Sequence, residues 1–221
     1  MRSTKIIVAL LTVWLIAPSS AQAEETLKYR WHLGGFFGTL ARVFLPGSGN
    51  GELSTRQLEA GNLEVELDIT APDAKGEFWR YGAEIDAADG RTLRAWSSYQ
   101  FRGRSDENRS ELDEEAVIDI VSGITLLRRE RPQEIRQLRI WNDGKIYPVS
   151  IIPRDRVTRN VNGKKVVARH YAIRARRVPN ERLWKGRLDI YLAEDEAATP
   201  IEISLERRMA RVRLLIDGVG D

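Results

Sequence analysis

Few residues of this 221-residue chain could do chemistry, apart from its many carboxylates. The chain has no cysteine and two histidines, His32 and His170, so it is short of the ligands that zinc, haem and iron–sulfur clusters need. Each histidine falls on the polar side of an alternating pattern, where a solvated side chain is more common than a catalytic base. No G-x-S-x-G, S-x-x-K or H-E-x-x-H motif occurs. We therefore expect a protein that is not an enzyme and that carries no cofactor or metal.

Two further motifs fail on their spacing. The acidic residues between Asp106 and Glu115 suggest a calcium site, but they do not match an EF-hand loop, and acids at a helix N-terminus are favoured by the helix dipole. The glycine-rich stretch from Pro46 to Gly51 lacks both the G-x-G-x-x-G spacing and the G-K-[ST] ending of phosphate-binding loops. We interpret it as a flexible turn.

Aromatic side chains are the remaining candidates for a binding site. Many of them lie on expected strands, where they could line a concavity between a curled sheet and a helix. They could equally fill the core, as large aromatics commonly do, and both readings stay open. The predicted ligand-binding residues, two of them from the helix, are Trp31, Trp79, Tyr81, Trp96, Ile120, Ile124, Trp141 and Tyr171.

One segment, residues 110–129, has the pattern of an amphipathic helix. Apolar residues recur three or four positions apart from Leu112 to Leu127, and acids occupy the opposite face. Ser110 and Asp113 form a capping-box pattern, arginines fill the last turn, and Pro132 prevents continuation. Such a helix must bury its apolar face, so we place it across a sheet.

Most of the remaining chain has the alternating pattern of antiparallel strands. Asp89-Gly90, Asn142-Asp143-Gly144 and Asn162-Gly163 are typical hairpin turns, and residues 146–152 and 156–161, between the last two turns, are expected to be separate strands. About ten strands and one helix fit one domain. We therefore predict a mostly β fold over residues 24–221, built as a single curled antiparallel sheet, a half-barrel or open barrel, with the amphipathic helix packed on its concave side.

The first 23 residues resemble a signal peptide. Arg2 and Lys5 precede the apolar run Ile6–Ala17, and Ala21-Gln22-Ala23 fits a cleavage site after Ala23. The run is too short for a membrane-spanning helix, which needs about 20 apolar residues. An exported chain without cysteine is typical of a bacterial envelope, so we expect a soluble periplasmic protein, which makes nucleic acid an improbable partner.

Charge is nearly balanced, with 35 basic and 32 acidic residues, but it is unevenly distributed. Acids prevail in residues 24–120 and bases in residues 121–221. One explanation is that opposite charges pair across strands of one sheet. The other is a basic face that meets an anionic partner, such as a membrane surface or an acidic glycan.

The second half of the chain contains three patterns that occur together in one family. They are the helix ending IVSGITLLRRERP, the hairpin IWNDGKIYPVSII, and LDIYLAEDEAATPIEISLE followed by ARVRLLI. In these patterns the chain resembles the exported bacterial proteins of domain-of-unknown-function family 3108. Tyr191 stands here in place of a tryptophan, and Met209-Ala210 in place of a glycine. The resemblance implies a periplasmic half-barrel sheet, similar to lipoprotein-carrier folds, and no known catalytic residues.

Two functions fit these observations. The first is a non-enzymatic periplasmic protein, a monomer that binds a lipid or another apolar ligand in the cup of the sheet. The second is an envelope assembly or interaction factor with a packed core, which would bind a partner protein through an arginine-rich surface.

Overall fold

The computed structural model describes residues 24–34, 47–71, 76–112, 114, 116–207 and 210–218. The expected leader, residues 1–23, and its cleavage site lie outside this part of the chain. Among the described residues, no helix has the length and apolar character needed to cross a membrane.

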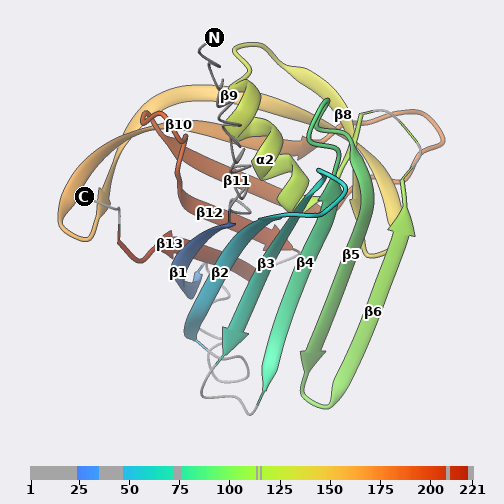
Figure 1. Ribbon diagram of the computed structural model, residues 1–221, viewed down its shortest axis with the longest axis horizontal. Coiled ribbons are helices and arrows are strands. Elements are labelled where there is room, and N and C mark those ends of the chain that lie inside the picture. The colour runs from blue at the N-terminus through green and yellow to red at the C-terminus, as the bar shows by residue number, and fades with distance from the viewer. Residues whose placement is uncertain are drawn as a thin grey trace, which may run out of the picture.

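The described strands form a 13-stranded sheet, with the order β6-β5-β4-β3-β2-β1-β13-β12-β11-β10-β9-β8-β7 (Figure 1). The first six strands are β1 (Glu24–Gly34), β2 (Ser48–Gln57), β3 (Leu63–Ala71), β4 (Glu77–Ile85), β5 (Thr92–Phe101) and β6 (Arg104–Glu111). The others are β7 (Val117–Ile118), β8 (Arg136–Asn142), β9 (Lys145–Val161), β10 (Lys164–Ala175), β11 (Gly186–Ala193), β12 (Pro200–Arg207) and β13 (Ala210–Ile216).

Neighbouring strands are antiparallel except for the short parallel pair of β7 and β8. Because β1 pairs with β13, the first and last of these strands along the chain lie side by side in the middle of the sheet. Strands β6 and β7, which are consecutive in the sequence, therefore lie at opposite edges. The sheet curls so far that the edges approach: Trp141 of β8 donates from Nε1 to Ser110 Oγ of β6 at 3.0 Å. The predicted mostly β, curled open sheet is confirmed.

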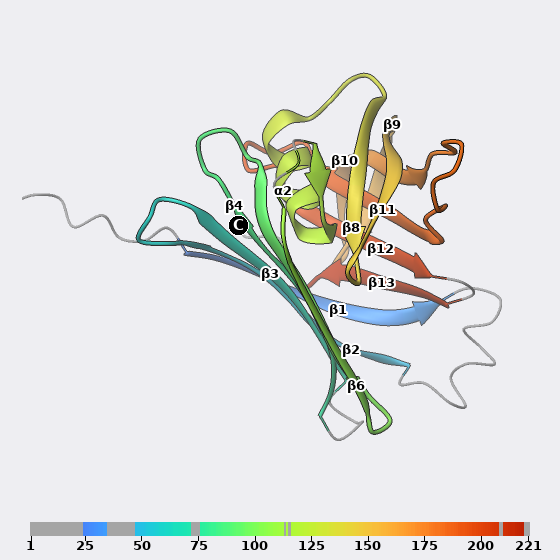
Figure 2. The same ribbon diagram turned by 90° about the vertical axis from the view of Figure 1, so that its right-hand side faces the viewer.

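The helix, α2 (Ile120–Glu130), lies inside the bend of the sheet, between the β1–β6 half and the β8–β13 half (Figure 2). Its position on the concave side is as predicted, but the helix begins ten residues later than the predicted start at residue 110. Residues 104–111 form the edge strand β6, and Val117–Ile118 form β7. The apolar residues Leu112 and Val117 are buried, yet they pack in a separate small cluster with Trp141.

The helix starts at Ile120 because Asp119 supplies the N-cap that we had assigned to Ser110. Asp119 Oδ1 accepts from the Ser122 backbone N–H at 2.8 Å, and Ser122 Oγ accepts in return from the Asp119 N–H at 2.8 Å. This reciprocal pair satisfies donors that a helix start leaves open. The other end is as expected: Arg128 and Arg129 occupy the last turn, and Arg131 closes it with a left-handed φ of 46°.

The space under the helix is filled by side chains. Ile124 and Leu127 are fully buried, and they share one hydrophobic core with residues from both halves of the sheet, including Tyr29, Leu67 and Ile203. The strands contribute alternate residues to this core, as their sequence pattern predicts. The alternative in which the aromatic and apolar residues fill a core thus describes the region around the helix.

Two strand predictions are corrected. The glycine-rich stretch ending at Gly51, interpreted as a turn, is the start of β2 from Ser48 onward. Its glycines make room for neighbours, because a Cβ on Gly49 would overlap the Thr70 carbonyl oxygen and the Trp31 indole. Residues 146–152 and 156–161, expected as separate strands, belong to the single long strand β9.

Candidate ligand-binding groove

The predicted site residues do not form one site. Ile120, Ile124 and Trp31 are core residues with almost no exposed surface. Trp31 donates from Nε1 to the Thr70 carbonyl oxygen at 2.8 Å, which satisfies its polar group inside the protein. Trp141 is likewise buried, in the small cluster beside β6. These four residues hold the fold together, and none of them is open to a ligand.

Two other predicted site residues, Trp96 and Tyr171, lie away from the other candidates. Trp96 lies over Gly82 on the face of the sheet opposite the helix, where the Arg109 guanidinium stacks on it at 5.3 Å. Tyr171 is buried, and it borders a separate cavity of ≈ 330 Å³ that is lined by Arg131, Arg156 and Arg169. Burial raises the pKa of the Tyr171 hydroxyl, while the Arg169 guanidinium opposes this effect.

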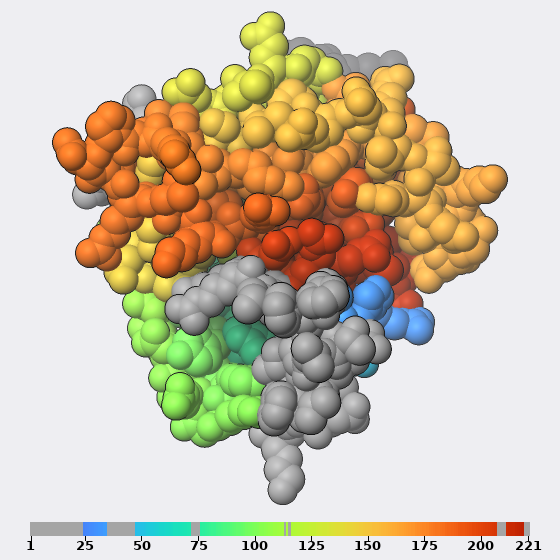
Figure 3. All heavy atoms as spheres, turned by 180° about the vertical axis from the view of Figure 1, so that it is seen from behind, coloured from blue at the N-terminus to red at the C-terminus, as the bar shows by residue number. Residues whose placement is uncertain are grey.

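Trp79 and Tyr81 do line an open cavity of ≈ 590 Å³ on the concave side, which we call the aromatic groove. It lies between strands β4–β6 and the β8–β9 turn. Figure 3 shows this side of the molecule, where the green atoms of the β5–β6 region lie next to the yellow and orange atoms of the second half. The groove is lined by Trp79, Tyr81, Ser97, Ser98, Tyr99, Phe101, Asp106, Asn108, Asp143, Gly144 and Lys145.

The aromatic wall of the groove is anchored in the core. The Trp79 ring meets the buried Trp31 ring edge to face, with centroids 6.4 Å apart, and packs against Phe101 at 5.4 Å. Tyr99, which is opposite Trp79 in the β4–β5 register, is 36% exposed. The wall thus combines a fixed base with an accessible surface, as in preformed sites for apolar groups.

The opposite side of the groove is polar. Asp143 in the β8–β9 turn accepts a hydrogen bond from Ser97 Oγ of β5 at 3.2 Å, and so ties the turn to the aromatic wall. Gly144 has a φ of 72° and lies against Asn108 of β6, so that a Cβ at this position would come 3.1 Å from Asn108 Oδ1. A ligand here would meet aromatic rings on one side and hydrogen-bonding groups on the other.

Tyr99 and Phe101 line the groove although the sequence did not indicate them as site residues. Both are on β5 at positions that alternate with Trp96, which shows that Trp96 faces the other way. Counting outward from Asp89-Gly90 as a two-residue turn would have paired Trp79 with Gln100, and the irregularity between Glu84 and Ile85 changes the register so that Trp79 lies opposite Tyr99. The β8–β9 residues Asp143 and Lys145 had no signal in the sequence, because they reach the groove only through the curl of the sheet.

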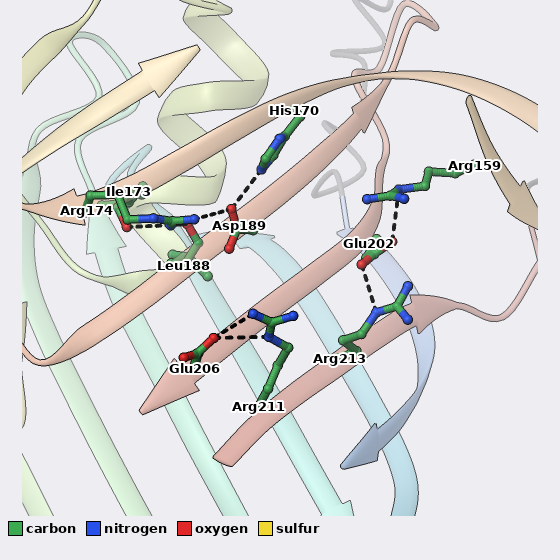
Figure 4. A network of polar contacts seen from close by, with 10 residues as sticks. All are labelled: Arg159, His170, Ile173, Arg174, Leu188, Asp189, Glu202, Glu206, Arg211 and Arg213. Atoms are coloured by element: carbon green, nitrogen blue, oxygen red, sulfur yellow. Dashed lines mark hydrogen bonds and ion pairs between the residues drawn. The ribbon is translucent and has the colours of Figure 1, made fainter. Parts of the chain in front are cut away.

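The outer face of β9–β13 carries a network of paired charges (Figure 4). Asp189 lies between His170 and Arg174, at 2.8 and 2.6 Å. Burial tends to raise the pKa of this carboxyl, but the hydrogen bonds from His170 and Arg174 outweigh burial and lower it. Glu202, with its side chain 5% exposed, lies between Arg159 and Arg213. His170 thus makes a structural hydrogen bond to Asp189 in this network.

Arginines elsewhere on the outer face also have acidic partners on neighbouring strands. Examples in the first half are Arg80 with Asp68 and Arg94 with Glu111. Pairs such as Arg128 with Glu25 and Arg30 with Asp217 join the acidic half to the basic half. Pairing across strands therefore accounts for many of these charges. Among the described residues, no group of three or more His, Cys, Asp or Glu side chains is placed to hold a metal.

Comparison with known proteins supports the fold and goes no further. The structure is similar to the crystal structure of a beta-barrel-like protein of domain of unknown function DUF1849 from Brucella abortus. The TM-score is 0.50 at 10% sequence identity, over 86% of this chain and 94% of that chain. No family model matches the sequence, and no curated protein matches it. At this level of identity the similarity shows a shared β-barrel-like architecture.

Proposed function

We propose that this is a non-enzymatic binding protein that holds an apolar part of a ligand in the aromatic groove. The observation that carries the proposal is the partly exposed aromatic wall of Trp79, Tyr81, Tyr99 and Phe101 beside a packed core. Aromatic rings that are fixed from behind lose little side-chain freedom when they contact a ligand, so binding costs less entropy.

The packed core under the helix supports a site outside the cup of the sheet. The sequence predicted a ligand in the cup of the sheet under the helix, but Ile120 and Ile124 occupy that space. The proposal therefore keeps the apolar ligand and moves its site to the groove at the side of the helix. The polar residues Asp106 and Asn108 along the groove favour an amphipathic ligand, such as a lipid, over a hydrocarbon without polar groups.

Features of the sequence support a periplasmic setting for this function. We propose that the protein acts as a soluble monomer in the periplasm after cleavage at Ala23, on the strength of the signal-peptide pattern and the absence of cysteine. Membership of domain-of-unknown-function family 3108 is a prediction that agrees with this setting. Pairing of the outer-face arginines makes that face a poorer candidate for partner binding than the groove.

The test is a titration of the purified protein with a fatty acid that carries an environment-sensitive fluorophore. We expect saturable binding, and we expect Trp79→Ala to raise the Kd about tenfold, because a large aromatic contact is worth about 1.4 kcal/mol or more. Trp96→Ala is the matched control, because it removes the same side chain from the opposite face, and it should change the Kd less than about twofold.

A second variant guards against loss of folding in Trp79→Ala. Tyr99→Ser removes an aromatic ring that is already 36% exposed, so it should fold normally and still weaken binding several-fold. The proposal is wrong if the probe does not bind to the folded protein, or if Trp96→Ala weakens binding as much as the two groove variants do.

A further inference from the structure

A second cavity lies on the other side of the β8–β9 turn from the aromatic groove. It measures ≈ 480 Å³, and we call it the basic pocket. Trp184 forms one wall; its Nε1 donates to Asn142 Oδ1 at 3.2 Å, and its ring lies directly over Gly186, where a Cβ would overlap it. The pocket is lined by Asn142, Asp143, Lys145, Tyr147, Arg182, Leu183, Trp184, Lys185 and Gly186.

The basic side chains of this pocket differ from those of the outer face. Within the part of the chain that the structure describes, the side chains of Lys145, Arg182 and Lys185 make no hydrogen bond and no ion pair. Asp143 is the one acidic residue among the described residues of the lining, and its carboxylate accepts a hydrogen bond from Ser97. Three basic side chains against this one carboxylate give the described lining a net charge of +2 (3 − 1), next to an apolar indole wall.

The basic pocket and the aromatic groove are two parts of one surface. Both cavities are lined by Asp143 and Lys145 of the β8–β9 turn. A ligand whose apolar part rests on Trp79 would reach the basic pocket by passing over this turn. Leu183, which is 46% exposed, adds apolar surface at the pocket.

We propose that the ligand is an anionic amphiphile, with its acyl or other apolar part in the aromatic groove and its carboxylate or phosphate in the basic pocket. Lys145, Arg182 and Lys185 supply the positive charge, and the guanidinium adds a planar fork of donors that suits either anion. This inference rests on the proposed function of the groove, because it assigns the charged end of the same ligand.

Three probes separate the claims: the fluorescent fatty acid, its uncharged methyl ester, and an alkyl phosphate of the same chain length as a competitor. We expect the acid to bind more tightly than the ester, and the alkyl phosphate to displace it. Arg182→Gln combined with Lys185→Gln should raise the Kd for the acid about fivefold. The same double variant should change the Kd for the ester less than about twofold. A higher salt concentration should weaken binding of the acid but not binding of the ester.

The matched control is Arg154→Gln combined with Lys165→Gln, which removes two exposed positive charges from the β9–β10 hairpin outside both cavities. It should leave the affinity for the acid unchanged. Equal affinities for acid and ester, or equal effects of the two double variants, would overturn the basic pocket and leave the groove standing. If inorganic phosphate alone displaces the acid as well as the alkyl phosphate does, the pocket is a free-anion site and the inference is again wrong. Failure of every probe to bind would instead refute the proposed function itself.

Discussion

Trp31 and Trp79 meet edge to face with ring centroids 6.4 Å apart, one inside the core and the other on the wall of the aromatic groove. They come from β1 and β4, which are separated in the sheet by β2 and β3. Their contact is possible because Gly49 of β2 has no side chain to fill the space at Trp31. A single glycine thus links the packing of the core to the shape of the proposed binding surface.

Gly49→Ala is therefore expected to destabilise the protein strongly. Its Cβ would overlap the Thr70 carbonyl oxygen, which is backbone and cannot move aside cheaply. We expect a loss of about 2–4 kcal/mol in the free energy of unfolding, measured by urea denaturation. Gly34→Ala, in β1 with no neighbour within 4 Å of the new Cβ, should change it by less than about 1 kcal/mol. Equal stability of the two variants would mean that Gly49 is not packed as described.

The filled interior under the helix predicts a purely structural role for Ile124. Ile124→Ala should lower the free energy of unfolding by about 2–5 kcal/mol, because Ile124 is fully buried and its removal leaves a cavity. Ile135, which is 63% exposed, provides the control, and Ile135→Ala should cost less than about 0.5 kcal/mol. The affinity of the folded Ile124→Ala protein for the fatty-acid probe should be unchanged. A large loss of affinity would return the ligand to the cup of the sheet.

Asp119 predicts a dependence of stability on pH. Complete burial raises its pKa from 3.8 to about 6, although its hydrogen bonds to Ser122 and Val121 oppose the rise. The folded state thus holds the proton more tightly than the unfolded state does. The contribution of this group is fully present below pH 3.8 and is lost as the pH rises through 6, with a total change on the order of 1–3 kcal/mol.

Asp119→Asn tests this dependence, because asparagine is also a good N-cap but does not titrate. Urea denaturation between pH 4 and 7 should show that the native protein loses more stability with rising pH than the variant does. Parallel curves for the two proteins would show that the Asp119 carboxyl titrates normally. Ser122→Ala, which removes the reciprocal hydrogen bond at 2.8 Å, should cost about 1 kcal/mol.

The local parts of the fold could be predicted from the sequence because they depend on neighbouring residues. Asn162-Gly163 and Asp143-Gly144 form hairpin turns in which both residues have positive φ, as such dipeptides favour. The predicted start of the helix, residue 110, was wrong. The apolar spacing of three or four residues between 112 and 120 also fits the observed short strand β7 followed by a helix. The cap that distinguishes the two is a local D-x-x-S pattern, Asp119 to Ser122, and the S-x-x-D pattern of Ser110 to Asp113 competes with it in the sequence.

The groove and the basic pocket could be predicted only in part. Trp79 and Tyr81 were identified by type and alternation, but Lys145 reaches their cavity, and Arg182 lies in the neighbouring cavity, only after the sheet has curled. The pairing of β1 with β13 that produces this curl joins opposite ends of the chain, and no local pattern specifies it. Trp96 was misplaced for a simpler reason, since a strand has two faces and residue type alone does not tell which one is inside.

The indole N–H resonances in a nitrogen-15 NMR spectrum test the central claim most directly. The described part of the chain has one tryptophan on the groove wall, Trp79, one in the basic pocket, Trp184, and one on the opposite face, Trp96. On titration with the fatty acid, the signals of Trp79 and Trp184 should shift together along one saturation curve, and the signal of Trp96 should stay in place. Binding that shifts Trp96 and leaves Trp79 unmoved would contradict the account.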